Sequence, residues 1–142
     1  MQPRDPTKIS SEVIHEILVR LLINLPQEEK QFPRILNNIK EACWFYGDNF
    51  CTNDPIMDNK FREKFAKRIF EHWATLKPEL PSLKDKWEEY RVYMSQIPSN
   101  GALIYDTTLN KLLFIIYHNP RERTVRKLDF PKGKVDQGED QM

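Results

Sequence analysis

The spacing of apolar residues changes once along this chain, close to Pro98. Before this proline, apolar residues recur every three to four positions in segments that prolines separate, which is typical of amphipathic helices. After it, β-branched and aromatic residues follow one another in short runs, and three of the four glycines lie in this last part. We therefore predict a mainly α fold, with a helical domain over residues 1–97 and the beginning of an α/β domain over residues 98–142.

Four helices are expected before Pro98, where the spacing of apolar residues changes. Their predicted spans are Ser10 to Leu25, about Pro33 to about Asp48, Asp58 or Asn59 to about Leu76, and Ser82 to Ile97. Pro26, Pro78 and Pro98 lie at predicted helix ends, because proline has no N–H for the hydrogen-bond ladder of a helix. Ser82 is followed three residues later by Asp85, which is close to a capping box. The predicted core stripe of the second helix is Phe32, Ile35, Leu36, Ile39, Cys43 and Tyr46.

Two short runs after Gly101 predict a β-hairpin. Ala102–Tyr105 and Leu112–Tyr117 are rich in β-branched, aliphatic and aromatic residues. The segment between them, Asp106–Lys111, is rich in residues that favour turns. We expect the two runs to pair with each other.

Composition excludes several classes of protein. With 142 residues, of which 39% are apolar, the chain can bury a core without disulfides. Its two cysteines, Cys43 and Cys51, lack the spacing of zinc ligands, and no run approaches the roughly 20 apolar residues of a membrane helix. There is no phosphate-binding Walker loop and no zinc-protease HExxH motif. We expect a globular protein without membrane contact, located in the cytosol or nucleus.

The second predicted helix carries a candidate binding site near its C-terminal end. If Cys43 faces the core, Trp44 points about 100° away around the helix, and Asp48 lies one turn further on beside it. An indole and a carboxylate together suit a cationic purine, because the ring face attracts positive charge and the carboxylate accepts hydrogen bonds from a guanine edge. The alternative is that Trp44 packs on another helix and Asp48 is solvated. Gly47 marks either a local loosening or the helix end.

Basic residues form two further clusters. Between Lys111 and Lys134, seven basic residues stand against two acidic ones, and such a patch suits phosphate groups or an RNA backbone. The alternative is a solvated hairpin and loop. The other cluster, expected to serve solubility rather than binding, consists of Lys60, Arg62, Lys64, Lys67 and Arg68.

Several of these residues resemble motifs of the mRNA decapping enzyme family, in its catalytic subunit. The segments that resemble the helical Box A domain of that subunit are Ile23–Pro26 with Glu28 and Glu29, and Ala42–Asp48. Those that resemble the entry to its Nudix domain are Ile97–Pro98, Gly101–Ile104 and Phe130–Lys134. The resemblance extends from about Ile9 to Glu139, which is nearly the whole chain.

The resemblance implies a function and a set of site residues. Members of the family remove the 5′ cap of mRNA, releasing 7-methylguanosine diphosphate, with Mg²⁺ or Mn²⁺ bound by glutamates. By resemblance, Trp44 stacks on the methylated guanine and Asp48 accepts hydrogen bonds from its edge. Lys132 and Lys134 approach phosphates, and the backbone carbonyl of Gly133 is a possible metal ligand. The resemblance also implies a partner of the helical domain, the activator decapping protein 1, and a location in cytoplasmic P-bodies.

The catalytic part of the Nudix domain is expected to be truncated. The segment from Gly133 to Glu139 fits the opening of the Nudix box, and the sequence ends three residues later. Glu139 alone cannot hold divalent cations against a pyrophosphate, because that chemistry needs several converging carboxylates. We therefore expect the 142-residue chain to be inactive by itself. The alternatives are a non-enzymatic helical adaptor that binds an activator or RNA and, more weakly, a Nudix hydrolase of free dinucleotides.

Overall fold

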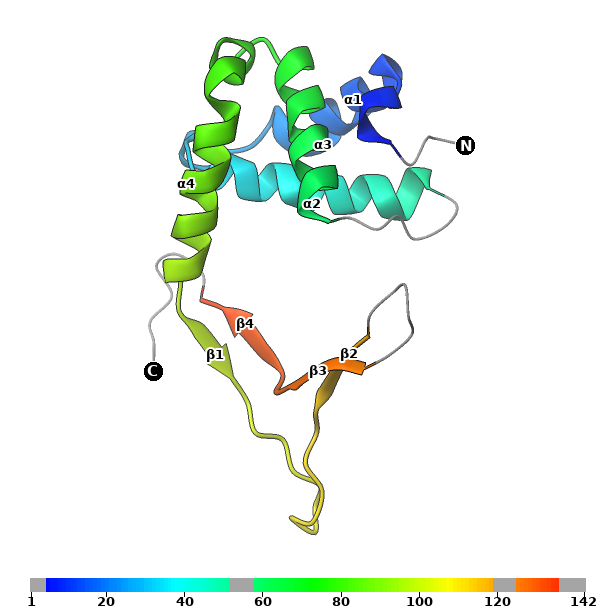
Figure 1. The fold of residues 1–142 in the computed structure, drawn as a ribbon, viewed down its shortest axis with the longest axis vertical. Coiled ribbons are helices and arrows are strands. Elements are labelled where there is room, and N and C mark those ends of the chain that lie inside the picture. The colour runs from blue at the N-terminus through cyan, green and yellow to red at the C-terminus, as the bar shows by residue number, and fades with distance from the viewer. Residues whose placement is uncertain (1–4, 52–57, 119–124, 136–142) are drawn as a thin grey trace. The chain divides into compact units, whose positions relative to one another are not determined.

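The computed structural model describes residues 5–51, 58–118 and 125–135 (Figure 1). The chain divides into two compact units, residues 1–94 and 95–142, which are described separately. The first unit holds the α-helices Ser11–Ile17 (α1), Arg34–Phe50 (α2), Asn59–His72 (α3) and Leu83–Gln96 (α4), the last of which ends just past the division. A π-helix spans Leu18–Leu22 (η2), and 3-10 helices span Pro6–Lys8 (η1), Gln27–Lys30 (η3) and Lys77–Ser82 (η4). The predicted mainly α fold, with helices first and short antiparallel strands after them, is confirmed.

Side-chain caps begin two of the helices. The Ser10 hydroxyl accepts a hydrogen bond from the Val13 N–H at 3.4 Å, and the Asp58 carboxylate accepts one from the Phe61 N–H at 2.8 Å. Each cap gives a partner to an N–H group that the helix itself leaves unpaired. The choice left open between Asp58 and Asn59 is therefore settled in favour of Asp58 as the cap of α3.

Two helices are shorter than predicted, although their buried stripes continue. The first gives way to the π-helix η2 after Ile17, where Leu18 and Leu22 remain buried. The third ends at His72, while Trp73 and Leu76 lie beyond it with only 8% and 4% of their surface exposed. Pro78 follows within a turn, and its missing N–H favours the tighter 3-10 geometry of η4 over further α-helix.

The structure overturns the prediction that Ser82 caps the fourth helix, and it decides between the two interpretations of Gly47. Ser82 does not cap α4, because it already belongs to η4 and its hydroxyl donates to the Glu79 carbonyl oxygen at 2.9 Å. Gly47 is not a helix end: it is buried inside α2, which continues to Phe50. The Gly47 carbonyl oxygen instead accepts the hydrogen bond from the Cys51 N–H that closes the helix, at 3.3 Å.

The first unit has an apolar core with an aromatic centre. Side chains that are 0% exposed include Ile14, Ile17, Leu22, Ile35, Leu36, Ile39, Cys43, Tyr46, Phe65, Ile69 and Phe70. The Tyr46 ring lies 5.7 Å from that of Phe65 and 6.0 Å from that of Phe50, between centroids. Among the residues described, no polar or charged residue is buried as a whole. Burial raises the pKa of the Cys43 thiol to about 12, so this cysteine remains protonated and unreactive at neutral pH.

The second unit is built from two antiparallel strand pairs. Its strands are Ser99–Gly101 (β1), Ile115–His118 (β2), Val125–Asp129 (β3) and Lys132–Lys134 (β4). β1 pairs with β4, with Ser99 opposite Lys134, and β2 pairs with β3, with Ile115 opposite Asp129.

The predicted pairing of Ala102–Tyr105 with Leu112–Tyr117 is confirmed next to the turn only. There Tyr105 and Leu112 form an antiparallel bridge, and the Leu113 N–H donates to the Ile104 carbonyl oxygen at 2.9 Å. Further along the second run, β2 takes β3 as its partner. The loop between the two runs closes on Asp106, whose carboxylate accepts the N–H groups of Asn110 and Lys111, each at 2.9 Å. Turn-forming residues thus predicted the loop correctly, but partner choice depended on a segment further along the chain.

The Asp58 cap gives a first test of this fold. We expect Asp58→Ala to lower the free energy of unfolding by about 1 kcal/mol, because the Phe61 N–H loses its acceptor. Urea denaturation followed by circular dichroism measures the change. Asp58→Asn, which keeps an acceptor oxygen, is the matched control; equal losses in both variants would show that the cap does not stabilise α3.

The loop closed by Asp106 gives a second test. Leu109 has a φ of 59°, in the left-handed region that favours glycine and asparagine, and its side chain is 74% exposed. We expect Leu109→Asn to stabilise the loop by roughly 0.5–1 kcal/mol. Hydrogen exchange at the Asn110 and Lys111 amides should then slow, whereas Leu103→Asn, also at an exposed leucine, should leave those rates unchanged or faster. Faster exchange in Leu109→Asn would contradict the prediction that the left-handed backbone conformation of Leu109 is strained.

Candidate functional site

Trp44 lies on the solvent side of α2. Its side chain is 51% exposed, whereas its neighbours Ala42 and Cys43 are 1% and 0% exposed. The other two tryptophans, Trp73 and Trp87, are 8% and 7% exposed. About half of Trp44 is thus accessible at the surface, whereas the other two tryptophans are packed into the core.

An arginine from α3 lies against this tryptophan. The central guanidinium carbon of Arg62 is 5.9 Å from the centroid of the Trp44 ring. This is within the range at which a cation is attracted to the electron-rich face of an indole. Arg62 belongs to the sequence cluster that we expect to serve solubility, and no spacing rule links residues on two different helices. Only the packing of α3 on α2 reveals the pair.

The stem of Arg62 is held between helices. Its Nε is buried and has no hydrogen-bond partner among the residues described. Its positive charge lowers the pKa values of Cys43 and Tyr90, although burial of both groups outweighs it, and the Tyr90 pKa is raised to about 12. Tyr90 in turn donates a hydrogen bond from its hydroxyl to the Asn37 side-chain oxygen at 3.1 Å. The charge of Arg62 thus acts on residues of α2 and α4, while its guanidinium lies against Trp44.

Asp48 lies one helical turn beyond Trp44 and is exposed. It is close to the C-terminal end of α2, at Phe50, where the carbonyl groups of a helix carry partial negative charge. A carboxylate there is electrostatically unfavourable by roughly 0.3–1 kcal/mol. A positively charged ligand beside Asp48 would reduce that repulsion, and its N–H groups would donate hydrogen bonds to the carboxylate.

The predicted phosphate-binding lysines lie on β4 in the second unit, and each already has a partner. Lys132 is 2.6 Å from the Asp129 carboxylate, which Lys127 also contacts at 2.7 Å. These two lysines hold the pKa of Asp129 well below its usual range. The Lys134 ammonium donates to the Ile97 carbonyl oxygen at 3.0 Å. All these contacts are at the surface, so the lysines remain reachable from solvent.

Gly133 lies between these lysines, opposite Asn100 of β1. A side chain at this glycine would meet no atom within 4 Å, so no close approach of the described backbone requires glycine there. Glu139, the first glutamate of the predicted Nudix box, lies outside the described residues. Within the described part of the chain, no three His, Cys, Asp or Glu side chains converge as they would around a metal ion. The metal roles of Gly133 and Glu139 stay predictions.

Comparison with known proteins identifies relatives along most of the chain. The mRNA-decapping enzyme subunit 2 of Arabidopsis thaliana is 28% identical over 132 residues, which cover 92% of this chain and 34% of that protein. The mRNA decapping complex subunit 2 of Schizosaccharomyces pombe is 25% identical, over 91% of this chain and 17% of its own length. The m7GpppN-mRNA hydrolase of Saccharomyces cerevisiae is also 25% identical, over 92% of this chain and 13% of its own length. The chain thus spans about a third or less of the relatives it matches.

The helical unit also matches a known domain family. The family described as "Dcp2, box A domain" matches residues 12–93, which is more than half of the chain. This range includes α2 and α3 in full and most of α1 and α4, and with them Trp44, Asp48 and Arg62. The chain therefore belongs to the Dcp2 box A domain family.

Proposed function

We propose that this chain binds the 7-methylguanosine cap of mRNA through Trp44 and Asp48, as part of an enzyme that hydrolyses the cap. The observation that carries the proposal is the half-exposed indole of Trp44 on a helix whose neighbouring residues are buried. The relative named m7GpppN-mRNA hydrolase supports the choice of ligand. Family membership supports the assignment of this chemistry to the helical unit.

The chemistry of the ligand suits the two side chains. Methylation at N7 gives the guanine ring a positive charge, and a cationic ring is attracted to the face of an indole. The N–H groups on the guanine edge are donors, and an ionised Asp48 offers acceptors only. Arg62 lies over the Trp44 ring, so we propose that the base stacks on the other face of the indole. Contact with Arg62 restricts the indole before the ligand binds, which lowers the entropy lost on binding.

The other parts of the reaction stay proposals for the enzyme as a whole. Lys132 and Lys134 suit the cap phosphates if they exchange Asp129 and the Ile97 carbonyl oxygen for phosphate oxygens. Mg²⁺ or Mn²⁺ would supply charge neutralisation and an activated water, and this requires carboxylates beyond those that the described residues bring together. Binding of decapping protein 1 and a cytoplasmic location are likewise proposals.

Substitution of Trp44 tests the proposal directly. We expect Trp44→Ala to weaken binding of a 7-methylguanosine-capped oligonucleotide by at least about fivefold, since stacking on an aromatic ring contributes about 1–3 kcal/mol per base. Isothermal titration calorimetry on the 142-residue chain measures the affinity. The same oligonucleotide with an unmethylated guanosine cap should bind more weakly, because its base is neutral at pH 7. Unchanged affinity of Trp44→Ala would contradict the proposal; if decapping protein 1 still bound, the adaptor function would replace it.

Asp48 is tested with a matched pair of variants. We expect Asp48→Asn to weaken cap binding by about fivefold or more, because hydrogen bonds to a charged acceptor contribute roughly 1.5–3 kcal/mol. Asp85→Asn removes the same charge from an exposed position on α4 and should leave the affinity unchanged. Equal effects of the two substitutions would show that only net charge matters.

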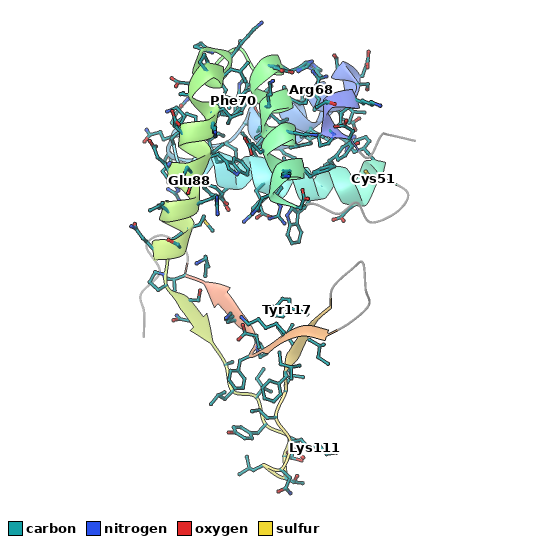
Figure 2. All side chains as sticks on the ribbon, viewed as in Figure 1. Cys51, Arg68, Phe70, Glu88, Lys111 and Tyr117 are labelled. Carbon is teal, nitrogen blue, oxygen red and sulfur yellow. The ribbon has the colours of Figure 1, made fainter. Side chains whose placement is uncertain are left out.

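Quenching of tryptophan fluorescence tests the contact between Arg62 and Trp44. Because Trp73 and Trp87 are buried, quenching of fluorescence by acrylamide reports mainly on Trp44. We expect Arg62→Ala to increase this quenching, since one face of the indole loses its cover. Arg91→Ala, whose guanidinium pairs with Glu88 on α4 (Figure 2), is the control and should not change it. Identical quenching in both variants would contradict the contact.

A further inference from the structure

An open groove of about 550 Å³ lies along α3 where the chain turns from η4 into α4. Its lining includes three apolar residues, here together called its floor: Leu80, Pro81 and Leu83. It also includes three lysines from α3 and one from the first turn of α4, here together called its rim: Lys60, Lys64, Lys67 and Lys84. Glu63 is the one acidic residue among those that line it. The groove is therefore an apolar surface with an excess of positive charge around it.

The three lysines of α3 share one face of the helix. They occupy positions i, i+4 and i+7, so their side chains lie above one another along the groove. Like charges at this spacing repel each other. Lys64 has a weak contact, 3.9 Å from the Asp5 carboxylate. No described carboxylate lies within ion-pair distance of Lys60, Lys67 or Lys84.

The two arginines of the same sequence cluster have different roles. Arg62 lies against Trp44. Arg68, labelled in Figure 2, pairs with Glu71 at 2.9 Å and donates to the Ile9 carbonyl oxygen at 2.9 Å, which ties α3 to the N-terminal segment. Both arginines thus have partners within the unit, whereas the lysines are gathered around the groove.

The lining of the groove selects one class of ligand. Single-stranded RNA is held by aromatic side chains on which bases stack, and none of the residues described around this groove is aromatic. Leucine and proline side chains instead suit aliphatic side chains, and the lysines suit carboxylates. We propose that this groove binds an acidic segment of a partner protein, with its apolar side chains on Leu80, Pro81 and Leu83 and its carboxylates at the lysines. This site is separate from the cap site and does not rest on it.

A designed peptide tests the proposal. The probe is a fluorescein-labelled 15-residue peptide with leucine at every third or fourth position and glutamate between, titrated into the 142-residue chain by fluorescence anisotropy. We expect saturable binding that weakens at least about fivefold when salt is raised from about 50 to about 300 mM, because exposed charges are then screened. A scrambled peptide of the same composition should bind several-fold more weakly, since its leucines cannot meet the floor together. Failure to bind, or equal binding of the scrambled peptide, would overturn the proposal.

Charge reversal identifies the site of binding. We expect Lys67→Glu to weaken peptide binding by about fivefold or more, and Lys84→Glu to do the same from the other side of the groove. Lys111→Glu changes an exposed lysine of the second unit (Figure 2) by the same charge and should have little effect. Circular dichroism confirms that each variant is folded. Equal weakening by Lys67→Glu and Lys111→Glu would overturn the assignment.

A titration with RNA distinguishes an acidic peptide from a nucleic acid as the ligand of the groove. Uncapped oligouridine of 15 nucleotides is titrated into the wild-type chain and into Lys67→Glu. We expect its affinity to change little between the two. If oligouridine binds in a Lys67-dependent manner and the acidic peptide does not, the groove is a nucleic-acid site and the proposal is overturned. Loss of cap binding in Trp44→Ala leaves this result unaffected, so the two sites are tested independently.

Discussion

The burial of one apolar stripe of α2 determines which residues of this helix are exposed at the surface of the first unit. Ile35, Leu36, Ile39, Cys43 and Tyr46 are all 0% exposed, and the Tyr46 ring lies at the centre of an aromatic cluster. Removing a large apolar side chain from such a core costs about 2–5 kcal/mol, so the helix cannot rotate about its axis without a large loss of stability. Because successive residues are turned by about 100° around a helix, burial of this stripe leaves both Trp44 and Asp48 exposed, one turn apart. The candidate cap site is thus a consequence of packing on the opposite face of the same helix.

The basic residues of α3 are divided between surfaces in a similar way. Its buried face carries Phe61, Phe65 and Ile69, and the charged residues between them point to different neighbours. Arg62 meets the Trp44 indole, while Lys60, Lys64 and Lys67 line the groove beside η4. One helix therefore positions a residue of the proposed cap site and forms a separate basic surface. A substitution on α3 therefore tests one of these two surfaces, depending on the face of the helix to which the residue belongs.

In the second unit, long-range pairing and local charge balance modify what the sequence suggests. β1 and β4 are about thirty residues apart in sequence and form a ladder with three pairs of residues. Within the basic patch, Asp129 contacts both Lys127 and Lys132, so the excess of positive charge counted along the sequence is smaller around these side chains. Such exposed ion pairs contribute little stability, and a phosphate could replace the carboxylate at small cost. The lysines are therefore held close to neighbouring groups without being removed from solvent.

Local patterns alone determined the helices, their apolar faces and the change to strands near Pro98, because these depend on the spacing of apolar residues and on proline. They also brought Trp44 and Asp48 together, since both lie on one helix one turn apart. Only the tertiary structure decided that β2 pairs with β3 and that Arg62 reaches Trp44. The same holds for the groove, whose floor and rim come from segments that meet when α3 and η4 pack together. These features depend on contacts between distant residues, for which the spacing along one helix or strand holds no information.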